Sequence, residues 1–296
     1  MRRHGLIAAE CAALTGSTPD DDGVAGCAGV ARVVRGAYVR TGLRAIAAAD
    51  DLDDLVSRVG ALDLDVDRFR VDLHDPSGRL GRASRDVAVA IADVLDDDPD
   101  LSDPRHRLVV VATDGRVALG EVVATADDAY RAHDAKPWTT SSSLDARVAR
   151  ALVNLVPDAR SILDPCCGAG SIVLEAASLG LRAIGVDDKA AMAGMTRENL
   201  AHLGLEATVE RADAREVEHR VDAVVTDLPY GHAIERDDAA VRAILERCAG
   251  LAPHGVFVAP HRIDAWLAGA GHRVDAVHEV VKRRGFSRWI HVTSTG

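Results

Sequence analysis

Aromatic residues and lysines are scarce in this chain of 296 residues. Phe, Trp and Tyr contribute three residues each and make up 3% of the sequence, so the hydrophobic cores must be built from Ala, Val, Leu and Ile. Only three of the 35 basic residues are lysines, and aspartate far outnumbers glutamate. This balance is typical of a high-GC or high-salt proteome, which would set the net charge of −11 without regard to function.

Paired cysteines and long apolar stretches are also missing. The five cysteines form no C-x-x-C pair and no spacing typical of metal ligands, so we expect no metal site. An odd, scattered set indicates reduced thiols and a cytoplasmic protein. No apolar stretch approaches the ~20 residues that span a bilayer. Glu10 interrupts the only candidate for a signal-peptide core, so we expect neither a signal peptide nor a membrane anchor.

The acidic net charge by itself disfavours a nucleic-acid ligand, but phosphate contact depends on local clusters of basic residues. Each of two such clusters is either a phosphate-binding surface or an ordinary solvated face, and the sequence leaves both interpretations open. The first cluster contains Arg68, Arg70, Arg79, Arg82 and Arg85, and the second contains Lys282, Arg283, Arg284 and Arg288.

The chain changes its pattern near residues 137–143, where a run of Thr and Ser ends at a candidate helix N-cap. Before this point the elements are short and mixed, which predicts a small α+β module. We therefore expect an N-terminal region over 1–135, a linker over 136–146 and a second domain over 147–296. In the N-terminal region, strands are expected at 30–39, 68–73, 108–112 and 117–123, and helices at 51–59 and 84–95.

After the boundary, strands and helices alternate, which predicts a parallel, doubly wound α/β sheet. The C-terminal end differs. Two strands, expected at 274–281 and 288–293, are joined by a short link without a helix, and such a link makes an antiparallel pair. We expect an otherwise parallel sheet with one antiparallel strand near its edge.

A glycine-rich turn lies between a predicted strand and a predicted helix. It reads Asp164-Pro165-Cys166-Cys167-Gly168-Ala169-Gly170. Its glycines let the backbone pass close to a ligand, and the helix N-terminus behind them favours a carboxylate or phosphate. The third glycine of the dinucleotide fingerprint is replaced by Val173. The turn therefore favours S-adenosylmethionine over NAD, with a purely structural turn as the alternative.

Two more acids follow successive predicted strands. Asp187 ends the next strand, 23 residues after Asp164, where it could accept both ribose hydroxyls of a nucleotide or cap the following helix. Asp213 comes just after the third strand and could accept from an adenine amino group or lie in a surface loop. Matching acids at successive strand ends favour the cofactor interpretation.

The segment Asp227-Leu228-Pro229-Tyr230 follows the apolar run at 221–225. A carboxylate and the next backbone carbonyl can accept the two hydrogens of a planar amino group. The Tyr230 ring can cover the flat face of a base, or pack under the loop instead. This arrangement suits methyl transfer to the exocyclic nitrogen of a nucleobase.

With these residues the chain resembles Class I S-adenosylmethionine-dependent methyltransferases that methylate amino groups. Residues 164–170 resemble the D-P-x-C-G-x-G cofactor motif, and residues 227–230 resemble the [DN]-P-P-[YFW] catalytic motif, with Leu228 where Pro is usual. The resemblance implies a seven-stranded Rossmann-like sheet. It also implies S-adenosylmethionine contacts from Asp164, Cys166, Gly168, Gly170, Asp187 and Asp213, and catalysis by Asp227, Leu228, Pro229 and Tyr230.

A narrower resemblance covers most of the chain. Tyr130-Arg131, Lys136-Pro137, residues 152–155 and residues 285–288 are similar to the THUMP-containing tRNA guanine-N2 methyltransferases. This implies methyl transfer to guanosine N2 in tRNA, and an N-terminal region with a ferredoxin-like segment and a tRNA-binding THUMP domain. Other amino-group substrates remain open, namely ribosomal RNA guanine, DNA adenine and protein glutamine, as does a catalytically idle RNA-binding factor. The oligomeric state is also open.

Overall fold

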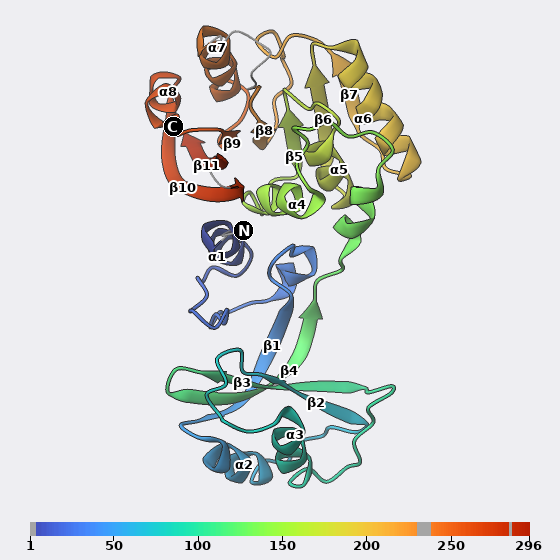
Figure 1. The fold of residues 1–296 in the computed structure, drawn as a ribbon, viewed down its shortest axis with the longest axis vertical. Coiled ribbons are helices and arrows are strands. Elements are labelled where there is room, and N and C mark those ends of the chain that lie inside the picture. Colours follow the sequence, from blue (N-terminus) through green and yellow to red (C-terminus); the bar gives the residue numbers. More distant parts are fainter. Residues whose placement is uncertain (1–3, 230–237, 284–285) are drawn as a thin grey trace. The chain divides into compact units, whose positions relative to one another are not determined.

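The computed structural model describes residues 4–229, 238–283 and 286–296, which form two compact units (Figure 1). The smaller unit contains Thr15–Val34 and Arg40–Ala126. The larger unit contains the described parts of Met1–Leu14, Arg35–Val39 and Asp127–Gly296.

The smaller unit is a four-stranded sheet with two helices on one face (Figure 1). The strand order is β1-β4-β3-β2, with β2 parallel to β3 and the other neighbours antiparallel. Fully buried Phe69, Ile91 and Leu108 lie in the core between sheet and helices. The elements are β1 (Thr41–Ala49), α2 (Leu52–Gly60), β2 (Phe69–His74), α3 (Ser84–Ala92), β3 (His106–Thr113) and β4 (Arg116–Thr125).

Local sequence explains most of these elements. Asp51 is the N-cap of α2, and its side chain accepts a hydrogen bond from the Asp54 backbone N–H at 2.8 Å. Gly115 has a φ of 70° in the turn between β3 and β4, a conformation that glycine adopts without steric cost. The predicted helices and the predicted strands at 68–73, 108–112 and 117–123 are confirmed within a few residues.

The strand predicted at 30–39 is wrong. Residues Ala31–Arg35 form the short 3-10 helix η1, and the strand is β1, further along the chain. The backbone N–H groups of Ala37, Tyr38 and Val39 all donate to the carboxylate of Glu10, at 2.7–3.1 Å. Because these donors are bound by a side chain, they are not available for a β-ladder.

The larger unit is built on a seven-stranded sheet in the order β10-β11-β9-β8-β5-β6-β7. Strand β11 runs antiparallel to both of its neighbours, whereas the other neighbouring strands are parallel. The strands are β5 (Ser161–Asp164), β6 (Arg182–Asp187), β7 (Thr208–Arg211), β8 (Ala223–Asp227), β9 (His254–Ala259), β10 (His272–Arg283) and β11 (Phe286–Thr295).

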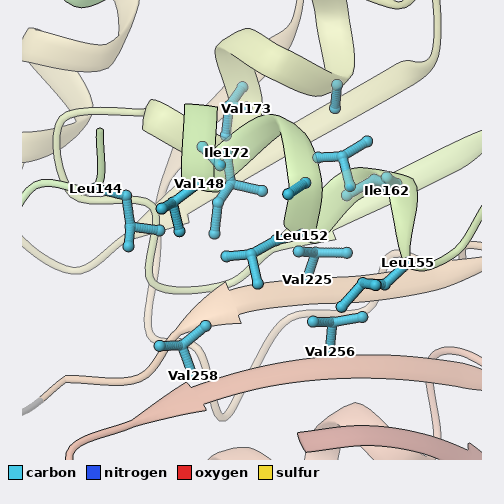
Figure 2. Packing of buried hydrophobic residues seen from close by; sticks show 14 of the residues in the cluster. Leu144, Val148, Leu152, Leu155, Ile162, Ile172, Val173, Val225, Val256 and Val258 are labelled. Carbon is cyan, nitrogen blue, oxygen red and sulfur yellow. The ribbon is translucent and has the colours of Figure 1, made fainter. Parts of the chain in front are cut away.

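Helices cover both faces of this sheet. Ala223 and Val225 of β8 pack in one hydrophobic cluster and Val224 packs in the other, because successive side chains of a strand point to opposite faces. Figure 2 shows the first cluster, in which Leu152 and Ile172 lie near Val225. The helices are α1 (His4–Thr15), η2 (Ala129–Ala135), α4 (Ala146–Asn154), α5 (Ser171–Ser178), α6 (Ala190–His202), α7 (Asp238–Ala249) and α8 (Asp264–Gly269).

Segments expected in the N-terminal region pack in the larger unit. Glu10 of α1 is fully buried, and its carboxylate accepts a 2.7 Å hydrogen bond from Asn154 Nδ2 of α4 in addition to the three backbone donors at 37–39. The compact units therefore divide the chain differently from the expected boundaries at 135 and 147. Burying a carboxylate is costly unless it is hydrogen-bonded, so the hydrogen bonds of Glu10 hold α1 to α4.

A second buried network holds η2 in the larger unit. The carboxylate of Glu175 accepts from Arg150 Nε at 2.7 Å and lies 2.6 Å from His133 Nδ1. Arg150 and Glu175 are both fully buried. Removing either partner would deprive a buried charge of its nearest counter-charge, because Asp127 lies farther from Arg150, at 3.7 Å.

None of the helices in the described residues has the length and apolar character that crossing a membrane requires.

Candidate active site

The predicted acids of the site lie at one edge of the seven-stranded sheet. Asp164 ends β5, Asp187 ends β6 and Asp227 ends β8, while Asp213 follows β7 by two residues. These four strands are parallel, so their carboxyl ends meet at the same edge. In sheets of this kind, that edge is where ligands bind.

The glycine-rich turn between β5 and α5 is held in a conformation that needs glycine. Gly168 and Gly170 have φ values of 55° and 85°. A Cβ atom on Gly170 would lie 2.7 Å from Cγ2 of Thr196 on α6. The Thr196 hydroxyl donates to the Gly168 carbonyl at 2.8 Å, so α6 fixes the shape of the turn.

Asp164 is buried beneath this turn. Its Oδ1 atom accepts hydrogen bonds from the Thr226 hydroxyl at 2.7 Å and from the Cys166 backbone N–H at 3.2 Å. Burial raises the pKa of Asp164 to about 7, and the nearby carboxylates of Asp227 and Asp187 add to the effect. A cation bound beside Asp164 would therefore stabilise the ionised form of its carboxyl and lower this raised pKa.

Asp187 braces the turn and the start of α6. Its Oδ2 accepts from the Gly168 backbone N–H and its Oδ1 from the Lys189 backbone N–H, each at 3.0 Å. Burial raises the pKa of its carboxyl. The N-cap of α6 is Lys189, without a side-chain cap, so Asp187 precedes the helix and does not cap it, and each of its carboxylate oxygens retains a second acceptor site for a ligand hydroxyl.

Asp213 is bound to its own loop. It accepts from the backbone N–H and from Nε of Arg215, both at 2.9 Å. The hydrogen bonds to Arg215 hold the pKa of Asp213 at about 2, well below its usual range. Any bond from Asp213 to an adenine amino group would have to share the carboxylate with Arg215.

Cys166 and Cys167 contribute thiols rather than thiolates to the turn. Burial raises the pKa of both thiol groups far above their ordinary value. The thiolate is the reactive form of cysteine, so neither side chain is a nucleophile here. The interpretation of these residues as small side chains in a tight turn agrees with this environment.

The segment expected to hold the target base begins at the end of β8. The Leu228 backbone N–H donates to the Val258 carbonyl at 3.0 Å, and its side chain is buried in the cluster that contains Leu245 and Leu267. A proline at this position has no N–H and could not make that hydrogen bond. In this chain the hydrogen bond and the buried side chain of Leu228 hold the backbone that a proline ring would otherwise restrict. Pro229 is exposed, and Tyr230 lies outside the described residues.

Comparisons with known proteins identify the family of this chain. A family model described as RMKL-like, methyltransferase domain matches residues 134–252. The chain is 33% identical over 238 residues to a protein named tRNA (guanine(10)-N2)-dimethyltransferase from Methanothermobacter thermautotrophicus, in an alignment covering 74% of this chain and 70% of that relative. The chain belongs to this tRNA guanine-N2 methyltransferase family.

Further matches are shorter or more distant. A protein of the same name from Pyrococcus abyssi is 33% identical over 124 residues, which is 38% of each chain. Among solved structures, TrmN from Thermus thermophilus matches with a TM-score of 0.48 and 20% identity, over 92% of this chain and 88% of that one. As a member of the family, the chain is a methyltransferase that uses S-adenosylmethionine.

Sequence reasoning missed one residue at the site of this methyltransferase. Arg288 of β11 is buried, and its guanidinium lies 3.3 Å from Oδ2 of Asp227. It also donates a 2.6 Å hydrogen bond to the Ser142 carbonyl. Arg288 of the second basic cluster is therefore bound inside the protein and is not part of a solvated face, while the side chains of Lys282, Arg283 and Arg284 lie outside the described residues. Two signals in the sequence point to this segment, namely the basic cluster that contains Arg288 and the family resemblance at 285–288.

The basic cluster of the smaller unit is largely paired with acids. Arg68 bonds to Asp100 and Asp103, Arg70 to Asp72, Arg79 to Asp22 and Asp114, and Arg82 to Asp53. Such pairs neutralise much of the charge that a phosphate would meet. The interpretation of this cluster as solvated ion-paired surface is thus the one that its contacts favour.

Proposed function

We propose that this enzyme transfers methyl groups from S-adenosylmethionine to N2 of guanine 10 in tRNA. The position follows the printed name of the relative from Methanothermobacter thermautotrophicus, and dimethylation is proposed on the same ground. We place the reaction in the cytoplasm, where free thiols such as those of Cys166 and Cys167 persist.

One observation carries the assignment of roles. The Thr226 hydroxyl bonds to Asp164 at 2.7 Å, so the strand that ends in Asp227 is tied directly to the glycine-rich turn. A methyl donor held by that turn and an amino group held by Asp227 would lie at the same edge of the sheet. Proximity of this kind supplies much of the rate gain in group transfer.

The environment of the turn fits the donor. S-adenosylmethionine carries an ammonium group and a sulfonium, and the latter makes its methyl carbon electrophilic. Asp164, with its raised pKa, offers a carboxyl that a cation would stabilise in the ionised form. Gly168 and Gly170 permit close approach of the backbone, Cys166 lies beside them, and the carboxylates of Asp187 and Asp213 can accept from hydroxyl and amino groups.

On the acceptor side, the residues of this chain orient and polarise the base. For the first transfer, Asp227 accepts a hydrogen bond from one N–H of the guanine amino group and the Leu228 carbonyl accepts one from the other, which counters delocalisation of the nitrogen lone pair into the ring. The proton that N2 loses as the N–CH3 bond replaces the S–CH3 bond can pass to the Asp227 carboxylate. Pro229 restricts the loop, and Tyr230 stacks on the base, a contact worth about 1–3 kcal/mol. The guanine must leave its helix to reach this site.

For the N-terminal part we propose a ferredoxin-like segment and a THUMP-like domain that bind tRNA, within residues 1–135. The support is the sequence resemblance together with the four-stranded sheet and two helices of the smaller unit. The contacts of Arg68, Arg70, Arg79 and Arg82 with acids direct the search for phosphate contacts to other residues of this unit.

The test is incorporation of labelled methyl groups into tRNA transcripts, followed by nucleoside analysis. We expect N2-methylguanosine and N2,N2-dimethylguanosine with a transcript that has guanine at position 10, and no product when adenine replaces it. Incorporation only into ribosomal RNA, DNA or protein would assign another substrate. No incorporation into tRNA, ribosomal RNA, DNA or protein would favour the alternative function of a catalytically idle RNA-binding factor.

Asp227→Asn is the matched catalytic variant, because it keeps the size of the side chain. We expect transfer to slow by roughly 10²–10³-fold, as for loss of one polar group aimed at the reacting centre. The affinity for S-adenosylmethionine should stay close to that of the unchanged chain in a calorimetric titration. Equal loss of affinity and transfer would contradict the role of Asp227 in holding the base.

A further inference from the structure

The insertion of β11 between β9 and β10 places an arginine beside the acid of the acceptor segment. In the sheet, Asp227 is level with Val258, and Val258 is level with Ile290. Arg288, two residues before Ile290, therefore reaches the carboxyl end of β8. Its side chain is 7% exposed, and its guanidinium lies 3.3 Å from the Asp227 carboxylate.

Arg288 also contacts a segment that is linked to the glycine-rich turn. Arg288 donates to the carbonyl of Ser142 at 2.6 Å, within the segment 138–144. That segment is also bound to the glycine-rich turn: Asn199 accepts from the Trp138 backbone N–H at 2.9 Å and donates to the Ala169 carbonyl at 2.8 Å. One guanidinium thus joins the acceptor acid to the segment that the Asn199 side chain links to the donor turn.

The chemistry of the pair suits a positioning role. The planar guanidinium of a buried arginine presents its N–H donors in a fixed fork, so it fixes the rotamer of a carboxylate opposite it. A carboxylate has about four acceptor sites on its two oxygens. Contact of Oδ2 with Arg288 uses only some of these sites, so this contact does not itself prevent Asp227 from accepting from an amino group.

We propose that Arg288 is a positioning residue for methyl transfer, which holds the Asp227 carboxylate in the orientation that the guanine amino group requires and links it to the segment 138–144. This proposal rests on the proposed function, since it assigns Asp227 to the acceptor. It predicts an effect on the transfer step itself, whereas a purely structural arginine would affect only the amount of folded protein.

The experiment compares Arg288→Gln and Arg288→Lys in the full chain with a tRNA transcript. Single-turnover rates at saturating tRNA and S-adenosylmethionine are normalised to the stoichiometry of cofactor binding. We expect Arg288→Gln to lower the rate roughly 100-fold at unchanged cofactor affinity. Arg288→Lys should lose less than about tenfold, because an ammonium keeps the charge but cannot contact both partners as the planar guanidinium does.

Arg273→Gln is the matched control. Arg273 lies on β10 of the same sheet and pairs with Asp275 at 2.8 Å, with a side chain that is 79% exposed. This variant should transfer methyl groups at the rate of the unchanged chain. If Arg288→Gln does not bind the cofactor, the decision falls to Arg288→Lys, which must then show a reduced rate at unchanged affinity.

Three results would overturn the proposal. They are a normalised rate for Arg288→Gln within about twofold of the unchanged chain, equal rates for Gln and Lys, and a loss explained entirely by the fraction that binds cofactor. Failure of the proposed function looks different, because the unchanged chain itself would then not methylate tRNA. In that case thermal unfolding tests the contact, since adding Asp227→Asn should raise the melting temperature of Arg288→Gln if the two side chains are coupled.

Discussion

The two units of this enzyme differ in the burial of their arginines, since the buried arginines among the described residues, Arg150 and Arg288, lie in the larger unit. In the smaller unit, Arg58 and Arg70 pair at the surface with acids that are near neighbours in the sequence, Asp54 and Asp72. In the larger unit, Arg150 and Arg288 are buried and pair with acids on other elements of the fold. Exposed pairs contribute little to stability, whereas breaking a buried pair leaves a charge in the interior. Burial, rather than the number of basic residues, therefore locates the arginines on which this enzyme depends.

The largest expected effect comes from breaking the buried pair of the larger unit. Glu175→Ala removes the nearest carboxylate from the fully buried Arg150 and leaves only Asp127, at 3.7 Å, so we expect a loss of about 3–5 kcal/mol in the free energy of unfolding. Urea denaturation measures this loss. Asp103→Asn is the control, because it breaks an exposed pair with Arg68 and should leave the unfolding midpoint unchanged. Equal losses of unfolding free energy for Glu175→Ala and Asp103→Asn would contradict the difference between buried and exposed pairs.

A somewhat smaller loss is expected where a buried acid binds backbone groups instead of an arginine. Glu10→Ala leaves the N–H groups of residues 37–39 and the Asn154 amide without their acceptor. We expect a loss of about 2–4 kcal/mol, since a few buried donors become unsatisfied and some will find water. Hydrogen exchange should show faster exchange in α1 and at 37–39. Unchanged exchange there would mean that α1 is held to the unit by its apolar contacts alone.

Buried and more exposed carboxyl groups of this enzyme also differ in the pH at which they ionise. Asp164, with a pKa of about 7, should bind the cation of S-adenosylmethionine only when ionised, while Asp213, with a pKa of about 2, stays ionised. The dissociation constant should therefore rise as pH falls below about 7, approaching tenfold per pH unit. Calorimetry in buffers of different ionisation enthalpy would detect the released proton. A constant affinity between about pH 5 and 8 would contradict the role of Asp164.

Ionisation of Asp164 should favour cofactor binding, but it should lower the stability of the protein without ligand. Between the ordinary pKa of 3.8 and the raised pKa of about 7, the folded state binds more protons at Asp164 than the unfolded state does. The contribution of Asp164 to the free energy of unfolding therefore falls as pH rises through this window. Asp164→Asn should remove both pH dependences, which separates this carboxyl from the others.

The smallest effects are expected for the paired arginines of the smaller unit. Arg70→Gln and Arg82→Gln should change the KM for tRNA by less than about twofold, because their guanidinium groups are already bound to Asp72 and Asp53. Steady-state assays at several salt concentrations test this. A higher KM together with a weaker salt dependence would show that these arginines exchange their acids for phosphates.

The features that could be predicted from the sequence are those that neighbouring residues determine. The glycines of the turn at 168–170 are required by positive φ angles, and the acids at 164, 187 and 227 follow apolar runs that end as strands. The false strand at 30–39 shows the limit of such reasoning. Its alternating pattern is real, but the backbone donors at 37–39 bind Glu10, a partner that lies outside any local window.

By itself, the sequence determined the alternation of strands and helices, the glycine-rich turn and the acids at the strand ends, since hydrophobic periodicity and turn chemistry act over a few residues. Only the tertiary structure decided which charges are buried and with which partners. It placed Arg288 beside Asp227 through the antiparallel strand β11, and it placed α1 in the larger unit through Glu10. These pairings depend on desolvation, which arises only when distant segments pack together.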